Sequence, residues 1–195
     1  MRIVLNLLFV AIALFLLYTL YTSIREPIAF NKERNIREAA VIDKLKEIRQ
    51  AQEMYRYITG EFAGDFDTLA QVLTEDSFAI IKIIGDPDDP DFTGEIIKDT
   101  LLSPAIDSVI ALGMNLDSLR YVPFGEPGLT FNISADTLTY QKTLVNVVEV
   151  GIPRRKFMGK WGSSHFKRYD QTYSPEKPLK FGDMNAPKLA GNWED

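Results

Sequence analysis

The stretch from residue 3 to residue 24 reads IVLNLLFVAIALFLLYTLYTSI and contains no charged side chain. Its one strongly polar residue before the Tyr- and Thr-rich end is Asn6. Because an α-helix rises about 1.5 Å per residue, about 20 residues cross the roughly 30 Å hydrocarbon layer. A cleaved signal peptide is the alternative, but its apolar region is shorter and ends in a small-x-small site, whereas residues 21–25 read YTSIR. We predict a retained, single-pass membrane anchor over residues 1–26.

The charges beside the apolar stretch bear on its orientation. Arg2 alone precedes it. The positive residues that follow are interleaved with acidic ones: Arg25, Lys32, Arg34 and Arg37 with Glu26, Glu33 and Glu38. Counted literally, the positive-inside rule places the downstream domain in the cytoplasm. A very short tail with one Arg is also how a signal anchor begins, and we favour a domain on the periplasmic side of a bacterial inner membrane.

Residues 31–58 have the periodicity of an amphipathic helix. Apolar side chains recur at steps of three and four, at Val41, Leu45, Ile48, Ala51, Tyr55 and Ile58. Polar side chains take the other face, at Lys44, Lys46, Glu47, Gln50 and Glu53. Gly60 is a normal helix stop, and Pro27, before this helix, can bend a helix or mark the first turn of a new one. We expect the apolar stripe to pack against the rest of the domain.

A turn and shorter elements follow the long helix. Residues 60–67 read GEFAGDFD, which indicates a turn, and Asp65 is a candidate N-cap for a short helix over residues 66–73. Residues 78–84 read FAIIKII, a compact apolar run that fits a buried strand or a helix end. Further along, Ser103-Pro104 can start a short helix that Gly113 would end.

The second half of the domain has the pattern of β-structure. Strands are predicted at residues 119–124, 129–134 and 138–150, with turns at 125–128 and 135–137. These short connections imply an antiparallel meander. The predicted fold class is therefore α+β, with a transmembrane helix that continues into a long amphipathic helix packed on a small antiparallel sheet. Residues 27–150 form the domain, and residues 151–195, rich in Pro, Gly, Lys and isolated aromatics, are predicted to be an extended tail.

Three short motifs follow one another around the end of the long helix: residues 48–55 read IRQAQEMY, residues 59–62 TGEF and residues 66–69 FDTL. Together with the apolar N-terminal helix that passes a proline, they resemble type IV pilins and type II secretion pseudopilins over residues 1–75. In that family the long helix commonly ends in an Ala-x-x-x-Tyr stretch and a Gly-x-Tyr-Pro turn. The resemblance implies a pilin-like fold and a role in an envelope secretion, motility or pilus-like machine.

Two features depart from that family. Its precursors carry a peptidase site, Gly followed by Phe or Met, ahead of the apolar segment, and a glutamate early within it. Here Met1-Arg2 leads straight into Ile3, and no acidic residue occurs before Glu26. We therefore expect an unprocessed, pilin-like anchor protein.

Composition argues against several other classes of function. The chain of 195 residues has a formal net charge of −5, so no overall basic field gathers nucleic acid. It has no cysteine, which excludes disulfides, thiolate metal sites and a cysteine nucleophile. The single histidine, His165, lies in WGSSHF without a nucleophile elbow or catalytic spacing. We expect no enzymatic activity and no cofactor.

An acidic loop is a candidate calcium site. Residues 85–91 read GDPDDPD, and the hard oxygen ligands would come from Asp86, Asp88, Asp89 and Asp91. The spacing is not that of an EF-hand loop, and two prolines restrict how the carboxylates converge. Some pseudopilins bind calcium in a loop, so the resemblance adds to this interpretation. A solvated acidic loop is the alternative.

Residues 154–168 form a basic and aromatic segment, with Arg154, Arg155, Lys156, Trp161 and Phe166 as candidate interaction residues. Such side chains can contact a lipid headgroup region or a partner protein. Aromatics that simply pin the segment to the domain are the alternative.

From all these features we predict a membrane-anchored structural or assembly subunit that contacts other membrane subunits in a homo- or hetero-oligomer. A membrane-tethered module that binds a soluble ligand or calcium is the second hypothesis.

Overall fold

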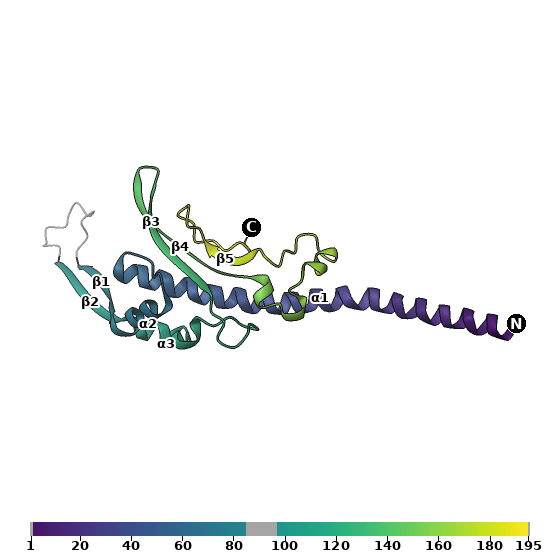
Figure 1. The fold of residues 1–195 in the computed structure, drawn as a ribbon. Coiled ribbons are helices and arrows are strands. Elements are labelled where there is room, and N and C mark those ends of the chain that lie inside the picture. Colours follow the sequence, from purple (N-terminus) through teal and green to yellow (C-terminus); the bar gives the residue numbers. More distant parts are fainter. Residues whose placement is uncertain (1, 85–96, 195) are drawn as a thin grey trace.

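The structure is a computed structural model that describes residues 2–84 and 97–194. The protein has an α+β fold with one long N-terminal helix and small antiparallel sheets (Figure 1). The helices are α1 (Arg2–Thr59), α2 (Phe66–Glu75), α3 (Ala105–Ala111) and α4 (Leu116–Leu119), and the 3-10 helices are η1 (Arg154–Lys156), η2 (Gly159–Trp161) and η3 (Ser164–Arg168). The strands are β1 (Ser77–Ile84), β2 (Ile97–Pro104), β3 (Asn132–Tyr140), β4 (Thr143–Pro153) and β5 (Pro178–Gly182).

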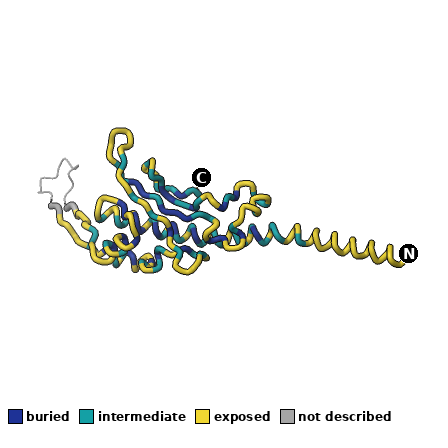
Figure 2. Tube along the Cα trace, in the orientation of Figure 1, coloured by how far each residue is buried: buried dark blue, intermediate teal, exposed yellow. Residues whose placement is uncertain are grey.

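Helix α1 is 58 residues long and contains Pro27 without a break. Of the two roles that the sequence left open for this proline, the first turn of a new helix is therefore excluded. The start of α1 extends beyond the rest of the molecule, and residues 2–21 are exposed (Figure 2). Within the described residues, α1 is the helix whose length and hydropathy suffice to cross a membrane.

The C-terminal half of α1 forms the centre of the domain. It lies between the sheet β3-β4-β5 on one side and α2 and α3 on the other (Figure 1). Val41, Leu45 and Ile48 are fully buried, as the helical spacing predicted. Tyr55 and Ile58, at the end of the same stripe, are partly buried against the core. This stripe joins the two layers into one hydrophobic core.

The end of α1 and the start of α2 agree with the sequence prediction. Gly60 has a φ of +85°, a left-handed conformation that ends the helix and that glycine adopts without strain. The side chain of Asp65 accepts a hydrogen bond from the backbone N–H of Thr68, which caps α2. The Thr68 backbone and hydroxyl donors lower the pKa of the Asp65 carboxyl.

The three-stranded sheet is antiparallel with the order β3-β4-β5, as expected for a meander, but its strands and turns lie at other residues than predicted. The expected turn at residues 135–137 lies inside β3, and the hairpin turns at Gln141 and Lys142, whose φ values are +48° and +70°. Residues 116–119 are helical, and the expected strand that follows is reduced to one isolated bridge between Tyr121 and Thr130. Asp136 was misinterpreted as a turn residue: its carboxylate caps the N–H of Thr137 within the strand instead.

Strands β1 and β2 form a separate antiparallel hairpin with Ile80 opposite Leu101 and Ala79 opposite Leu102. The apolar run at 78–84 is thus a strand, but its centre is not buried: Ile80 is 45% exposed and Ile81 is 61% exposed. No third strand pairs with this hairpin among the described residues. The sequence prediction of burial was wrong here because apolar composition does not specify what covers a strand.

Residues 151–194 pack along the domain. Strand β4 continues to Pro153, and β5 pairs with it antiparallel, with Val150 opposite Phe181. Phe157 and Phe181 are fully buried. At Gly182 φ is +80°, and a Cβ atom would lie 1.9 Å from the carbonyl oxygen of Val148, so only glycine fits at this end of β5.

Candidate functional site

The acidic loop that the sequence suggested for calcium, with Asp86, Asp88, Asp89 and Asp91, lies outside the described residues. Within residues 2–84 and 97–194, no group of three or more His, Asp or Glu side chains is arranged to hold a metal ion. The basic and aromatic segment is described in full, and its contacts define the candidate site.

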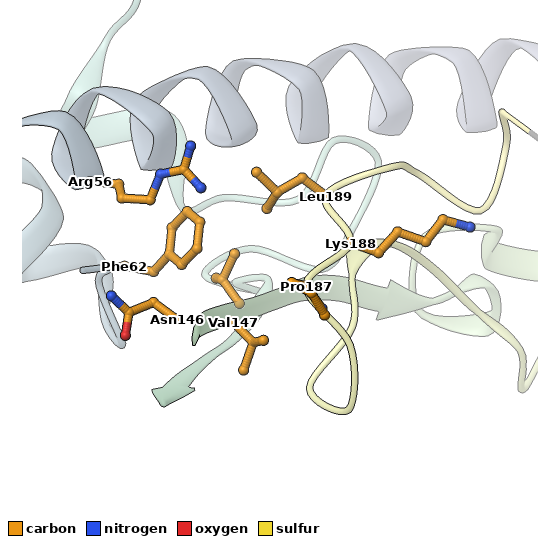
Figure 3. A pocket seen from close by; sticks show the side chains of 8 residues that line it. Arg56, Phe62, Asn146, Val147, Pro187, Lys188 and Leu189 are labelled. Carbon is orange, nitrogen blue, oxygen red and sulfur yellow. The ribbon is translucent and has the colours of Figure 1, made fainter. Parts of the chain in front are cut away.

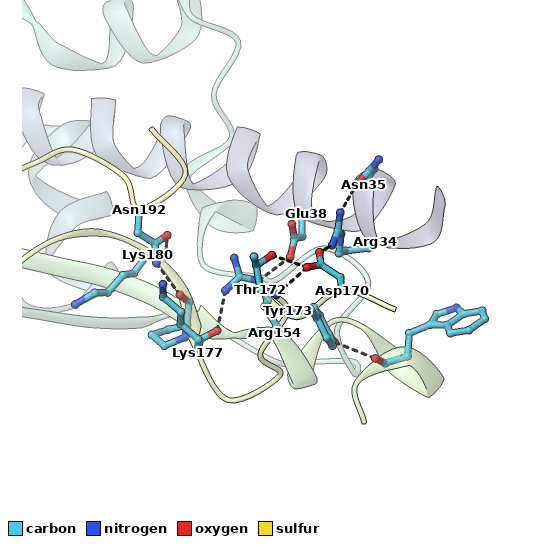
Figure 4. Close-up of polar contacts among 12 residues, drawn as sticks. Arg34, Asn35, Glu38, Arg154, Asp170, Thr172, Tyr173, Lys177, Lys180 and Asn192 are labelled. Atoms are coloured by element: carbon cyan, nitrogen blue, oxygen red, sulfur yellow. Dashed lines mark hydrogen bonds and ion pairs between the residues drawn. The ribbon is translucent and has the colours of Figure 1, made fainter. Parts of the chain in front are cut away.

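Arg154 is the first residue of η1 and joins the segment to α1. Its Nε donates to Oε1 of Glu38 at 2.6 Å, and its Nη1 donates to the carbonyl oxygen of Lys177 at 3.1 Å (Figure 4). Both side chains of the Arg154–Glu38 pair are mostly shielded from solvent. Such a pair fixes the position of η1 on the helix more strongly than an exposed pair would.

Arg155 and Lys156 lie on the outer side of η1. The Arg155 side chain is 52% exposed, and its guanidinium contacts the Glu176 carboxylate at 3.1 Å. The backbone N–H of Arg155 donates to the carbonyl of Pro175. Lys156 is exposed. Of the three basic residues that start the segment, Arg154 therefore holds the fold together and the other two face solvent.

Trp161 and Phe166 belong to an aromatic cluster around Phe30 of α1. The rings of Phe30 and Phe166 are stacked, with centroids 5.4 Å apart and an interplanar angle of 9°. Trp161 meets Phe166 edge to face at 4.8 Å, and Tyr173 meets Phe30 edge to face at 5.0 Å. Phe30 is fully buried, and Trp161 is 9% exposed. These aromatics thus pack into the domain close to the place where the apolar half of α1 leaves it.

Hydrogen bonds fix the two tyrosines of this cluster. Tyr173 donates its hydroxyl to the carbonyl oxygen of Trp161 at 2.9 Å, and burial raises the pKa of Tyr173 to about 12, with a smaller contribution from Glu38. Tyr169 donates to the Glu26 carboxylate at 2.7 Å, and this hydrogen bond raises the pKa of Tyr169. Both phenols stay protonated at neutral pH and act as donors to fixed acceptors.

The sequence analysis missed the N-terminal part of this contact. Phe30, Arg34 and Arg37 lie on the same face of α1 as Val41, but two of these positions are charged, so the prediction placed the start of the apolar stripe at Val41. Arg34 pairs with Asp170, and Nη1 of Arg37 donates to the carbonyl of Phe157 at 2.7 Å. The spacing of Phe30, eleven residues before Val41, was the available signal.

A pocket of about 180 Å³ lies near the other end of α1 (Figure 3). Arg56 and Phe62 line one side of it, and Val147 of β4 lines another, with the Arg56 guanidinium 5.0 Å from the centroid of the Phe62 ring. None of the lining residues is an acid, a histidine or a hydroxyl. The pocket therefore offers no acid–base pair.

His165 is exposed on η3, and its ring meets Phe166 edge to face at 5.3 Å. Ser163, two residues earlier, accepts a hydrogen bond from the backbone N–H of His165 through its hydroxyl, so this Ser caps η3. The candidate site is thus the contact surface between η1–η3 and residues 26–38 of α1.

No protein-family model, no curated protein and no solved structure matches this chain.

Proposed function

We propose that this protein is a membrane-anchored assembly subunit that holds its domain at a fixed distance from the bilayer and has no catalytic activity of its own. The observation that carries the proposal is the division of α1 into two halves. Its first half exposes apolar side chains on all faces, which is unfavourable in water and favourable in lipid. Its second half is the core of the domain, so the membrane segment and the fold share one helix.

The contacts between α1 and residues 154–173 support this role. Phe30, Arg34 and Glu38 are all held by the C-terminal segment, directly beyond the apolar half. A helix braced at this point transmits the orientation of the membrane segment to the domain. A flexible linker would serve a tethered enzyme or ligand-binding module equally well, whereas a braced helix suits a subunit whose geometry matters.

The exposed β1–β2 hairpin supports the assembly part of the proposal. Ile80 and Leu101, opposite each other on one face of the hairpin, are 45% and 62% exposed, and Ile81 and Leu102, on the other face, are 61% and 67% exposed. Apolar side chains that gather on a surface commonly mark a contact with another protein. The resemblance to pilins and pseudopilins agrees with a subunit of an envelope secretion, motility or pilus-like machine, with its domain on the periplasmic side of a bacterial inner membrane.

Site-specific photo-crosslinking in the native membrane tests this function. The full chain would carry a photoreactive amino acid at Leu102, and a matched probe at Gln50, which is exposed on the polar face of α1. We expect a discrete protein adduct from Leu102 and little from Gln50. If Leu102 and Ile81 give no protein adduct, and the chain runs as a monomer after mild detergent extraction, the assembly role is wrong.

A further inference from the structure

A groove of about 470 Å³ lies where the apolar half of α1 meets the domain. It runs between one face of α1 and the 3-10 helix η2. Its lining includes Tyr18, Tyr21, Arg25, Glu26, Lys160 and Trp161. The helical residues in this lining recur at steps of three and four, so they lie on one face of α1 and form one wall. The contacts described above for the aromatic cluster fix the opposite wall.

Glu26 is the acidic residue of this groove, and it already has two partners. Its carboxylate accepts a hydrogen bond from the Tyr169 hydroxyl at 2.7 Å and lies 3.2 Å from the Arg168 guanidinium. Its charge is therefore compensated from within the domain. An incoming ligand would not need to neutralise Glu26.

The two cations of the groove, by contrast, have no acidic partner among the described residues. Arg25 donates to the Tyr21 hydroxyl at 2.8 Å, and Nζ of Lys160 lies 4.7 Å from the centroid of the Trp161 ring. Within the described part of the chain, no carboxylate lies at ion-pair distance from either cation. The groove therefore presents net positive charge on a protein whose total formal charge is −5.

The position of the groove indicates which anion it would meet. Residues 3–24 cover about 33 Å as a helix, close to the thickness of the hydrocarbon layer, so Arg25 lies at headgroup level if α1 spans the bilayer. Tyr and Trp side chains favour the same level. We infer that the groove binds an anionic phospholipid, with its phosphate between Arg25 and Lys160 and an acyl chain along Tyr18. This inference rests on the membrane insertion proposed above.

Other ligands fit the same groove less well. Inorganic phosphate would satisfy the cations but would leave the aromatic wall of Tyr18, Tyr21 and Trp161 without a partner. A zwitterionic phospholipid carries its own ammonium group, so it brings no net charge to compensate the two cations. An anionic lipid combines both features, because its net charge matches the cations and its chain matches the aromatic wall.

Native mass spectrometry of the full chain tests this inference. The protein would be released from micelles that contain equal amounts of phosphatidylglycerol and phosphatidylcholine. We expect more phosphatidylglycerol than phosphatidylcholine adducts, and a loss of about five-fold in this preference for each of Arg25→Gln and Lys160→Gln, since a cation near the membrane surface contributes about 1 kcal/mol. Lys160→Arg should keep the preference. Lys82→Gln, on β1 near the other end of α1, is the matched control and should change nothing.

Equal adducts of the two lipids would overturn the inference, and so would a preference that survives both Gln variants. Binding of inorganic phosphate that competes with the lipid at the same concentration would identify a simple anion site instead and would also overturn it. Quenching of Trp161 fluorescence by brominated phosphatidylglycerol, in a Trp193→Phe background, gives a second readout. If the chain stays in carbonate-washed membranes but shows no lipid preference, only this inference fails. If the chain is released by carbonate, the proposed anchor itself fails.

Discussion

Gln52 connects the core of the domain to the turn after α1. It is fully buried, its Nε2 donates to the carbonyl of Ala63, and its Oε1 accepts from the N–H of Ala63, both at 2.9 Å. Gln52→Leu keeps the volume but leaves two buried backbone groups without partners, so we expect a loss of about 2 to 4 kcal/mol in the free energy of unfolding. Chemical denaturation in mild detergent measures it. Gln50→Leu, on the exposed face, should cost little, and an equal loss from both variants would contradict this role of Gln52.

Tyr173 makes the domain sensitive to high pH. Its pKa in the folded state is about 12, above its ordinary value of 10.0. Between these values the unfolded chain releases a proton that the folded chain keeps, so the stabilisation from this phenol is complete below pH 10 and is lost as pH rises through 12. We expect the free energy of unfolding to fall less steeply over this window in Tyr173→Phe. The exposed Tyr57→Phe should retain the wild-type slope, and identical slopes in all three proteins would refute the assignment.

At the scale of elements, the stripe of α1 carries the packing of the domain. Leu45 is fully buried, and Leu45→Asp puts a carboxylate into the core of the domain. This costs more than a typical buried Leu→Ala change, which costs about 2 to 5 kcal/mol. Against a total stability of about 5 to 15 kcal/mol, we expect the domain to unfold. Loss of the thermal transition in circular dichroism checks this. Ile36→Asp, at a position that is 47% exposed, should melt nearly as wild type.

The elements differ in how far the sequence predicted them. The stripe on α1 and the Asp65 cap were predicted because both depend on local spacing. The hairpin turn between β3 and β4 was not predicted, because Gln141 and Lys142 adopt left-handed conformations that neither residue type signals. The Ala-Asp-Thr sequence at residues 135–137 resembled a turn instead. The candidate site was predicted only in part: Trp161 and Phe166 were singled out, but their partner Phe30 lies more than a hundred residues earlier, and a single sequence does not show such pairing.

At the scale of the whole molecule, α1 sets the dimensions. A straight helix of 58 residues is about 87 Å long, and the domain surrounds only its C-terminal half (Figure 2). The apolar composition of the first half was evident in the sequence, whereas the unbroken passage through Pro27 was not, because a proline inside a helix more often bends or ends it. The fold class was predicted because the helical and strand periodicities are both strong; the layer order came only from the structure.

The central claim is that residues 3–24 stay in the bilayer as part of the mature protein, and the intact mass of the polypeptide in carbonate-washed membranes tests it most directly. Carbonate strips peripheral proteins, and the mass shows whether the first half of α1 is still attached. We expect the membrane pellet to hold the full chain of 22.1 kDa. Recovery of the chain in the wash, or a mass that lacks the residues up to Ile24, would contradict the claim.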